Sequence, residues 1–159
     1  MSTATNMKVL EPSRRAPRSG DVFALCVEGA GYVYGRVIST TAVVGPVTDL
    51  NLIYLYANRT GDLVEYSEIE LSREDLLVPP LMTNRLPWSR GYFRTIGHGD
   101  LTADDVLPVH VFRASDGRYY DENGVHVSIP DGPIGDRGVH SFRTIDDLVS
   151  DALGVPRTP

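Results

Sequence analysis

The chain has little cysteine: Cys26 is its single thiol among 159 residues, which excludes an intrachain disulfide. Cys26 stands within an apolar strand pattern, and we therefore expect a buried and inert thiol. A chain of this length can bury a core large enough to fold without disulfides. The lack of disulfides also suits a reducing compartment, and the cytoplasm is the location that we expect.

Long apolar runs are absent as well. No run approaches the roughly 20 residues that a membrane-spanning helix needs, so we expect no membrane association. The first 18 residues include three arginines but no apolar stretch that resembles a secretory signal. We expect residues 1–18 to form a flexible leader and residues 19–155 to form a single β-rich domain.

The recognised motifs of catalysis and metal binding are also missing. The four histidines do not have the spacing of an HExxH pair, a Cys/His zinc pattern or a calcium loop. There is no G-x-S-x-G elbow, and the glycines near the start lack the strand–helix context of a dinucleotide-binding loop. We expect no enzyme, no cofactor and no metal site. The alternative is a small hydrolase, whose visible candidates are His98, Asp100 and Asp104.

Basic side chains are scarce in the last third of the chain. The formal net charge is −6; residues 98–151 carry four basic and eleven acidic side chains, whereas residues 1–60 carry six and four. Binding to nucleic acid requires Lys and Arg against the phosphates, so we expect no nucleic-acid partner. An acidic surface suits a basic protein partner, because complementary potentials speed the encounter. The alternative is that these charges only keep the protein soluble.

What is present is mainly strand pattern. Residues 22–27 and 32–38 are two apolar runs that flank a Glu-Gly-Ala-Gly turn, which is typical of a β-hairpin. Residues 51–57 form a third run, rich in aromatic and β-branched side chains, and hairpin patterns return from residue 106. We expect an α+β fold that is mainly antiparallel β, either a strongly bent sheet or an SH3-like partial barrel, with a C-terminal α-helix.

The C-terminal helix is indicated by a change of period. Apolar residues recur at helical spacing along one face, at Ile145, Leu148, Val149, Ala152 and Leu153. Thr144 and Asp147 have the spacing of an N-cap, and Gly154 is placed to end the helix. We expect this helix to pack its apolar stripe over a sheet or at one end of a barrel.

Two segments are candidates for binding a partner. Trp88, Arg90 and Tyr92 lie in an irregular segment whose composition is typical both of an interface hot spot and of an anchor in the core. The acidic third contributes four further candidates, Asp100, Asp104, Asp131 and Asp136. The last two belong to a Gly/Asp-rich stretch, residues 131–138, which is either an exposed contact loop or a long surface connection.

Two segments carry a resemblance to a known family. GDVFAL followed by GYVYGRV, and PPLMTNRLPWSRGYF further along, together span roughly residues 19–97. In these motifs the chain resembles the immunity protein 26 family of bacterial polymorphic toxin systems. The resemblance implies a non-enzymatic inhibitor that binds and neutralises a cognate toxin, and a nuclease with a basic cleft is one toxin that the acidic region would suit.

The resemblance leaves two alternatives. A phosphotriesterase label is also attached to the family, but this sequence lacks the clustered His and Asp ligands that such a hydrolase uses. The other alternative is a β-barrel module that recognises a peptide or another protein unrelated to toxins.

Overall fold

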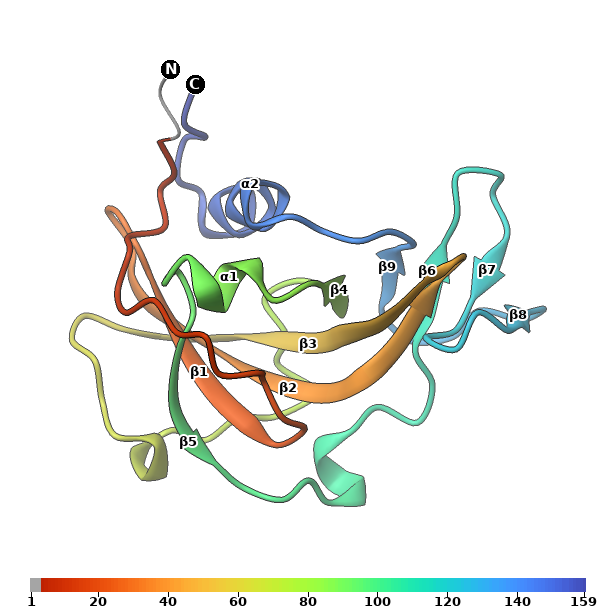
Figure 1. Cartoon of the computed structure of the whole chain (residues 1–159), viewed down its shortest axis with the longest axis horizontal. Helices are drawn as coiled ribbons and strands as arrows, with labels where there is room; N and C mark the ends of the chain where they lie inside the picture. The colour runs from red at the N-terminus through yellow and green to blue at the C-terminus, as the bar shows by residue number, and fades with distance from the viewer. Residues whose placement is uncertain (1–3) are drawn as a thin grey trace.

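The computed structural model describes residues 4–159 and contains two open β-sheets with a C-terminal helix (Figure 1). The first sheet is antiparallel throughout and has the order β4-β3-β2-β1-β5. Its strands are β1 (Asp21–Val27), β2 (Gly31–Val44), β3 (Val47–Thr60), β4 (Leu81–Thr83) and β5 (Arg94–His98). This confirms the predicted α+β, mainly antiparallel fold.

The β1–β2 hairpin forms where the sequence predicts it. Val27 pairs with Gly31, and the turn between them uses Gly29 and Gly31 at φ 81° and 92°. Gly31 is also required by packing, because a Cβ there would lie 2.5 Å from the carbonyl oxygen of Thr60 on β3. The turn therefore joins β1 to β2, and Gly31 lets the last residue of β3 lie close to the start of β2.

The first sheet is strongly bent, which is one of the two architectures predicted from the sequence. The pairing of β2 with β3 shifts register at four places, and such bulges increase local twist and bend a strand. The long β2–β3 hairpin therefore curves from the first sheet toward the second (Figure 1). Within residues 4–159 neither sheet closes into a barrel.

The second sheet is small and has the order β8-β7-β6-β9. Its strands are β6 (Val111–Arg113), β7 (Tyr119–Tyr120), β8 (His126–Val127) and β9 (Ile134–Asp136). The β6–β9 pair is parallel and the other two pairs are antiparallel. The tip of the long hairpin joins this sheet, because Val43 N donates to Glu122 O at 2.8 Å. Phe112, which is fully buried, packs in an apolar cluster with residues of β3 and β4.

The C-terminal helix α2 (Phe142–Leu153) is confirmed, although its start differs from the prediction. Ser141, rather than Thr144, is the N-cap, because the Ser141 hydroxyl accepts a hydrogen bond from Thr144 N at 3.2 Å. Gly154 ends the helix in the left-handed conformation, at φ 72°. Ile145 and Val149 are fully buried in the main core, which lies between the first sheet and α2.

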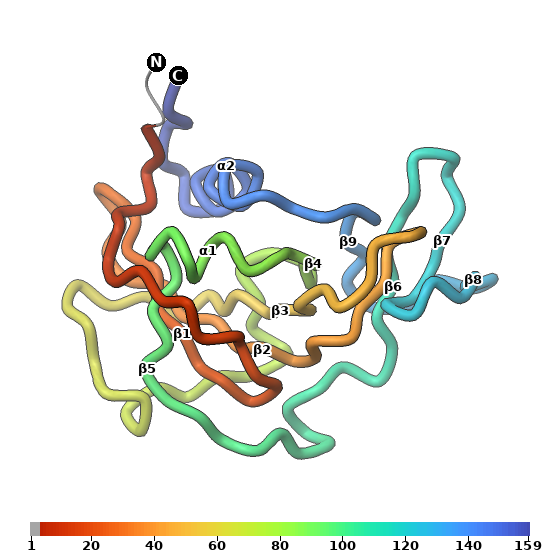
Figure 2. Tube along the Cα trace, viewed as in Figure 1, coloured from red at the N-terminus to blue at the C-terminus, as the bar shows by residue number. Residues whose placement is uncertain are grey.

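Of the expected flexible leader, residues 1–3 lie outside the described part of the chain, and residues that follow them make contacts with the fold. We call residues 5–18 the N-terminal strap; it runs along the fold before β1 begins (Figure 2). Met7 is 2% exposed and belongs to the main core, and Lys8 N donates to Cys26 O at 2.8 Å. Asp146 on α2 accepts hydrogen bonds from the backbone N–H groups of Asn6 and Met7, at 3.0 and 2.8 Å. These partners lie about 140 residues away along the chain, so the sequence gives no local sign of them.

No helix within residues 4–159 has the length and apolar character needed to cross a membrane. Cys26 is buried in β1 as a free thiol, as expected.

Candidate partner-binding face

The Trp88 segment is an anchor in the core, one of the two roles that its composition suggests. Trp88, on the short helix α1 (Leu86–Ser89), is 2% exposed, and its ring centroid lies 5.4 Å from that of Phe23 and 5.1 Å from that of Phe93. Tyr92 is 9% exposed and stacks on Phe142 of α2 at 4.9 Å. As candidates for partner binding, Trp88 and Tyr92 are therefore corrected: their side chains are packed inside the molecule. Arg90 is exposed and lies over the Phe142 ring.

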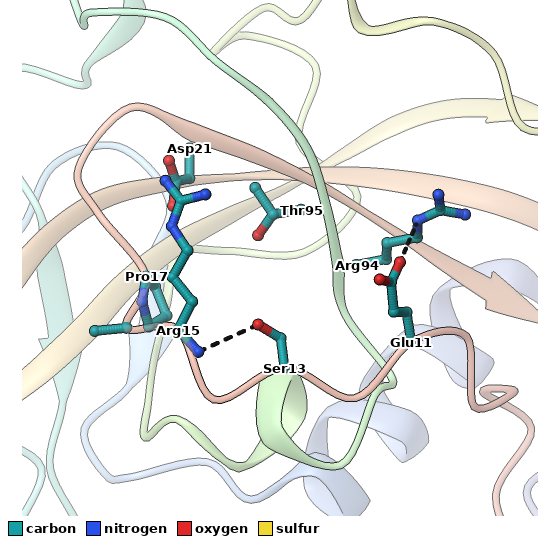
Figure 3. Close-up of a pocket in the computed structure, with 8 residues that line it drawn as sticks. Glu11, Ser13, Arg15, Pro17, Asp21, Arg94 and Thr95 are labelled. Carbon is teal, nitrogen blue, oxygen red and sulfur yellow. Dashed lines mark hydrogen bonds and ion pairs between the residues drawn. The ribbon is translucent and has the colours of Figure 1, made fainter.

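A small hollow of about 150 Å³ lies between the strap and β5 (Figure 3). Charged groups around it bind one another: Arg94 Nε lies 3.1 Å from a carboxylate oxygen of Glu11. Asp21, which is 1% exposed, lies 2.8 Å from His98 Nδ1 and 3.7 Å from a guanidinium nitrogen of Arg18. These ion pairs hold the strap and β5 in place.

The hydrolase candidates are only partly brought together. His98 Nε2 lies 3.5 Å from Asp100, whose side chain is fully exposed, and Asp104 is exposed on the 3₁₀ turn η2 (Ala103–Asp105). Within residues 4–159 no group of three or more His, Cys, Asp or Glu side chains is placed to hold a metal ion. Asp100 and Asp104 are thus exposed carboxylates close to each other in the chain.

Acidic side chains gather on the loop that joins β3 to β4, a feature that the charge of the last third of the chain does not indicate. Between residues 61 and 80 the chain carries one basic residue and six acidic ones, all six exposed: Asp62, Glu65, Glu68, Glu70, Glu74 and Asp75. Within residues 4–159 none of the six forms an ion pair. Over residues 61–97 as a whole, Arg85, Arg90 and Arg94 offset part of this charge, so the cluster shows only in a shorter window of about fifteen residues.

This acidic loop is held firmly against the first sheet. In its 3₁₀ turn η1 (Tyr66–Glu68), the Tyr66 ring packs directly on Gly97, where a Cβ would lie 2.8 Å from the ring, and its hydroxyl lies against Gly99. Further along, Asn58 Nδ2 donates to Glu70 O at 2.8 Å, and Ala57 N donates to Asp75 O at 2.9 Å. The carboxylates therefore project from a backbone with fixed contacts.

Two arginines tie the segment 99–106 to the acidic loop and to the sheet. Arg73 Nη1 donates to the carbonyl oxygens of Ala103 and Val106. Arg36, which is 7% exposed, donates to Gly99 O at 3.0 Å and pairs with Asp105 at 3.4 Å. The guanidinium groups of Arg73 and Arg36 are thus bound to backbone carbonyls or to Asp105.

Asp105 also closes the capping box of η2. Its carboxylate accepts hydrogen bonds from the backbone N–H and the hydroxyl of Thr102, at 2.8 and 3.0 Å. The hydrogen bond from the Thr102 backbone, with smaller contributions from the Thr102 hydroxyl and from Arg36, holds the pKa of Asp105 below its ordinary value. Asp105 is therefore ionised at neutral pH and fixes the segment that bears Asp104.

An apolar groove of about 480 Å³ opens beside the acidic loop. Its lining is mainly aliphatic and comes from three separate parts of the chain: Leu76, Leu77, Val78, Pro79, Leu107 and Pro133. Arg73 and Glu74 also line it, and Asp131 is exposed two residues from Pro133. We call this groove and the exposed carboxylates of residues 62–75, Asp100, Asp104 and Asp131 the acidic face.

A row of three hydrogen-bonded polar side chains fixes one wall of the groove. Glu122 contacts His110 Nδ1, and His110 Nε2 contacts the hydroxyl of Tyr54 on β3. The same hydroxyl accepts a hydrogen bond from Leu107 N at 2.9 Å. Burial raises the pKa of Tyr54 to about 12, so the hydroxyl stays neutral. These three side chains link the two sheets and hold Leu107 in place.

Asp136 lines a hollow with Val78 and Pro79, which also line the groove. It is exposed on β9 and pairs in register with Arg113 of β6. Arg113 and Arg137 share a second hollow with it, so the surface around Asp136 is of mixed charge. Of the four acidic candidates, Asp100, Asp104 and Asp131 are included in the acidic face, and Asp136 borders the groove within a surface of mixed charge.

Comparison with known proteins gives one family. The model of a family described as Immunity protein 26 matches residues 18–121. This range includes the first sheet, the acidic loop and β6, and it ends after β7, so that β8, β9 and α2 lie outside it. No curated protein and no solved structure matches the chain.

Proposed function

The chain belongs to the immunity protein 26 family, and on this premise we propose that it binds a cognate toxin and neutralises it through the acidic face. Inhibition by binding needs a stable scaffold and an accessible surface, and it needs no catalytic group. The observation that carries the choice of surface is the set of six exposed carboxylates, none in an ion pair within residues 4–159, on a loop whose backbone is fixed.

The charge of this face indicates the chemistry of the toxin. Enzymes that act on nucleic acid bind the phosphates with clusters of Lys and Arg. A surface that presents carboxylates at fixed positions is complementary to such a cluster, speeds association, and blocks access of the phosphates once bound. We therefore propose a nuclease toxin with a basic cleft, and the cytoplasm, where the nucleic acid is, as the place of action.

Co-expression tests this proposal. The protein encoded beside this chain's gene, produced in a bacterial host, is expected to stop growth, and co-expression of this chain is expected to restore growth and to yield a complex on purification. Toxicity that persists at equal expression, with no complex, would reject the proposal.

A titration separates binding from catalysis. A non-enzymatic inhibitor abolishes toxin activity when the two proteins are equimolar, and activity returns when the complex is denatured and the toxin is refolded alone. Complete and lasting inactivation by a small fraction of an equivalent would instead identify an enzyme that modifies the toxin.

A further inference from the structure

We infer that the apolar groove of the acidic face receives an apolar side chain of the toxin that is flanked by Lys or Arg; this inference rests on the proposed function. The groove volume, about 480 Å³, lies within the range of clefts that hold ligands in proteins. Its aliphatic lining offers little to a polar group, so the part that enters it is apolar.

The rim determines what surrounds that side chain. Glu74 lines the groove and is exposed, and Asp131 is exposed two residues from Pro133 in the chain. The lining cation, Arg73, directs its guanidinium to the carbonyl oxygens of Ala103 and Val106. The carboxylate of Glu74 has no ion-pair partner within residues 4–159, so a segment that carries cationic residues beside its apolar residue is complementary to it.

The apolar side chain of the toxin and the Lys or Arg residues that flank it have different effects on the binding kinetics. Charges at an exposed rim act mainly on the association rate, because they steer the encounter before contact. An apolar side chain buried in a groove acts mainly on the dissociation rate, because it must be returned to water before the partners separate. The groove is thus expected to set how long the complex lasts, and the carboxylates how fast it forms.

Binding kinetics of the purified chain with the catalytically inactivated product of the neighbouring gene test this assignment. Two substitutions make the groove polar without adding charge, Leu107→Gln and Pro79→Gln. Each is expected to raise koff about 10- to 100-fold and to change kon less than about twofold. Val9→Gln is the matched control, because Val9 is a 59% exposed apolar residue on the strap, and it is expected to leave both rates unchanged.

Each outcome has a separate meaning. Pro79 is exposed, so Pro79→Gln retains the fold even if Leu107→Gln does not, and thermal unfolding checks both variants. If the wild-type chain binds the toxin and folded Pro79→Gln dissociates at the wild-type rate, the groove inference fails and the proposed function stands. If the wild-type chain does not bind, both fail. Self-association of the chain that Leu107→Gln or Pro79→Gln abolishes would assign the groove to a second copy and overturn the inference.

Discussion

The strap side and the acidic face of this molecule use charged side chains in different ways. On the strap side the cations hold the fold together: Arg94 binds Glu11, Arg85 donates to the carbonyl oxygen of Arg14, and Arg18 pairs with buried Asp21. On the acidic face the backbone is held by hydrogen bonds and by the Tyr66 ring, and the carboxylates stay exposed.

The comparison shows why composition alone misplaces a binding surface. Trp88, Arg90 and Tyr92 have the composition of an interface hot spot, yet the two aromatic rings pack against Phe23, Phe93 and Phe142. The acidic loop has no aromatic residue except Tyr66, and under the proposed function its exposed charges are what the toxin meets first. Exposure on a fixed backbone is therefore the criterion on which we propose the acidic face.

The largest expected effect is on the strap side, from Trp88→Ala. This substitution removes a fully packed ring from the aromatic cluster, and we expect it to lower the free energy of unfolding by about 3–5 kcal/mol. Urea denaturation measures the loss. If the variant keeps wild-type stability but no longer binds the toxin, Trp88 belongs to the interface, and the strap side rather than the acidic face is the binding surface.

A smaller loss is expected from Asp146→Ala, which removes the acceptor of the Asn6 and Met7 N–H groups. A buried donor left without an acceptor costs about 1–3 kcal/mol, and we expect a total loss within this range because detachment of the strap lets both donors bind water. Amide hydrogen exchange at Asn6 and Met7 is expected to become faster because the strap detaches from α2. Asp147→Ala, on the same helix but 40% exposed, is the control; equal effects of the two substitutions would contradict the role given to Asp146.

Charge reversal on the acidic face is expected to leave stability almost unchanged and to slow binding. With Glu65, Glu68 and Glu70 all changed to Lys, we expect kon with the toxin to fall about tenfold or more at low salt, and the difference to shrink at high salt because ions screen the attraction. Arg14→Glu on the strap makes the molecule more acidic, so it is not expected to slow association. Slower association from Arg14→Glu alone would place the partner on the strap side.

The smallest effect is expected from Asp105→Asn, which weakens the contact with Arg36 and the cap of η2. We expect a loss of about 1 kcal/mol at neutral pH. Because folding lowers the pKa of Asp105, its contribution is complete above the ordinary value of 3.8 and is lost as the pH falls through the folded-state pKa. Denaturation curves at several pH values are therefore expected to converge for the two proteins in acid; a constant difference would contradict this cause.

The parts of the fold predicted from sequence are those that local residues determine. The β1–β2 turn depends on Gly29 and Gly31, and α2 depends on an apolar stripe and on Gly154, all visible within a few positions. The strap was missed because Met7 and Asp146 lie 139 residues apart. The Tyr54–His110 contact joins residues 56 positions apart, and no local pattern indicates it.

The candidate site was predicted in part for the same reason. Asp100, Asp104 and Asp131 were found because they lie in a long acidic region. The groove could not be predicted, since Leu76, Leu107 and Pro133 meet only after both sheets have formed. Physical assembly of distant segments, rather than any motif, creates the apolar half of this surface.

Amide hydrogen exchange of the chain alone and in complex with the toxin tests most directly whether the acidic face is the binding surface. If the acidic face is the binding surface, exchange slows in residues 61–79, 99–107 and 130–134, and stays unchanged in the strap and in α1. Slower exchange confined to the strap and α1, with the acidic loop unaffected, would contradict the account.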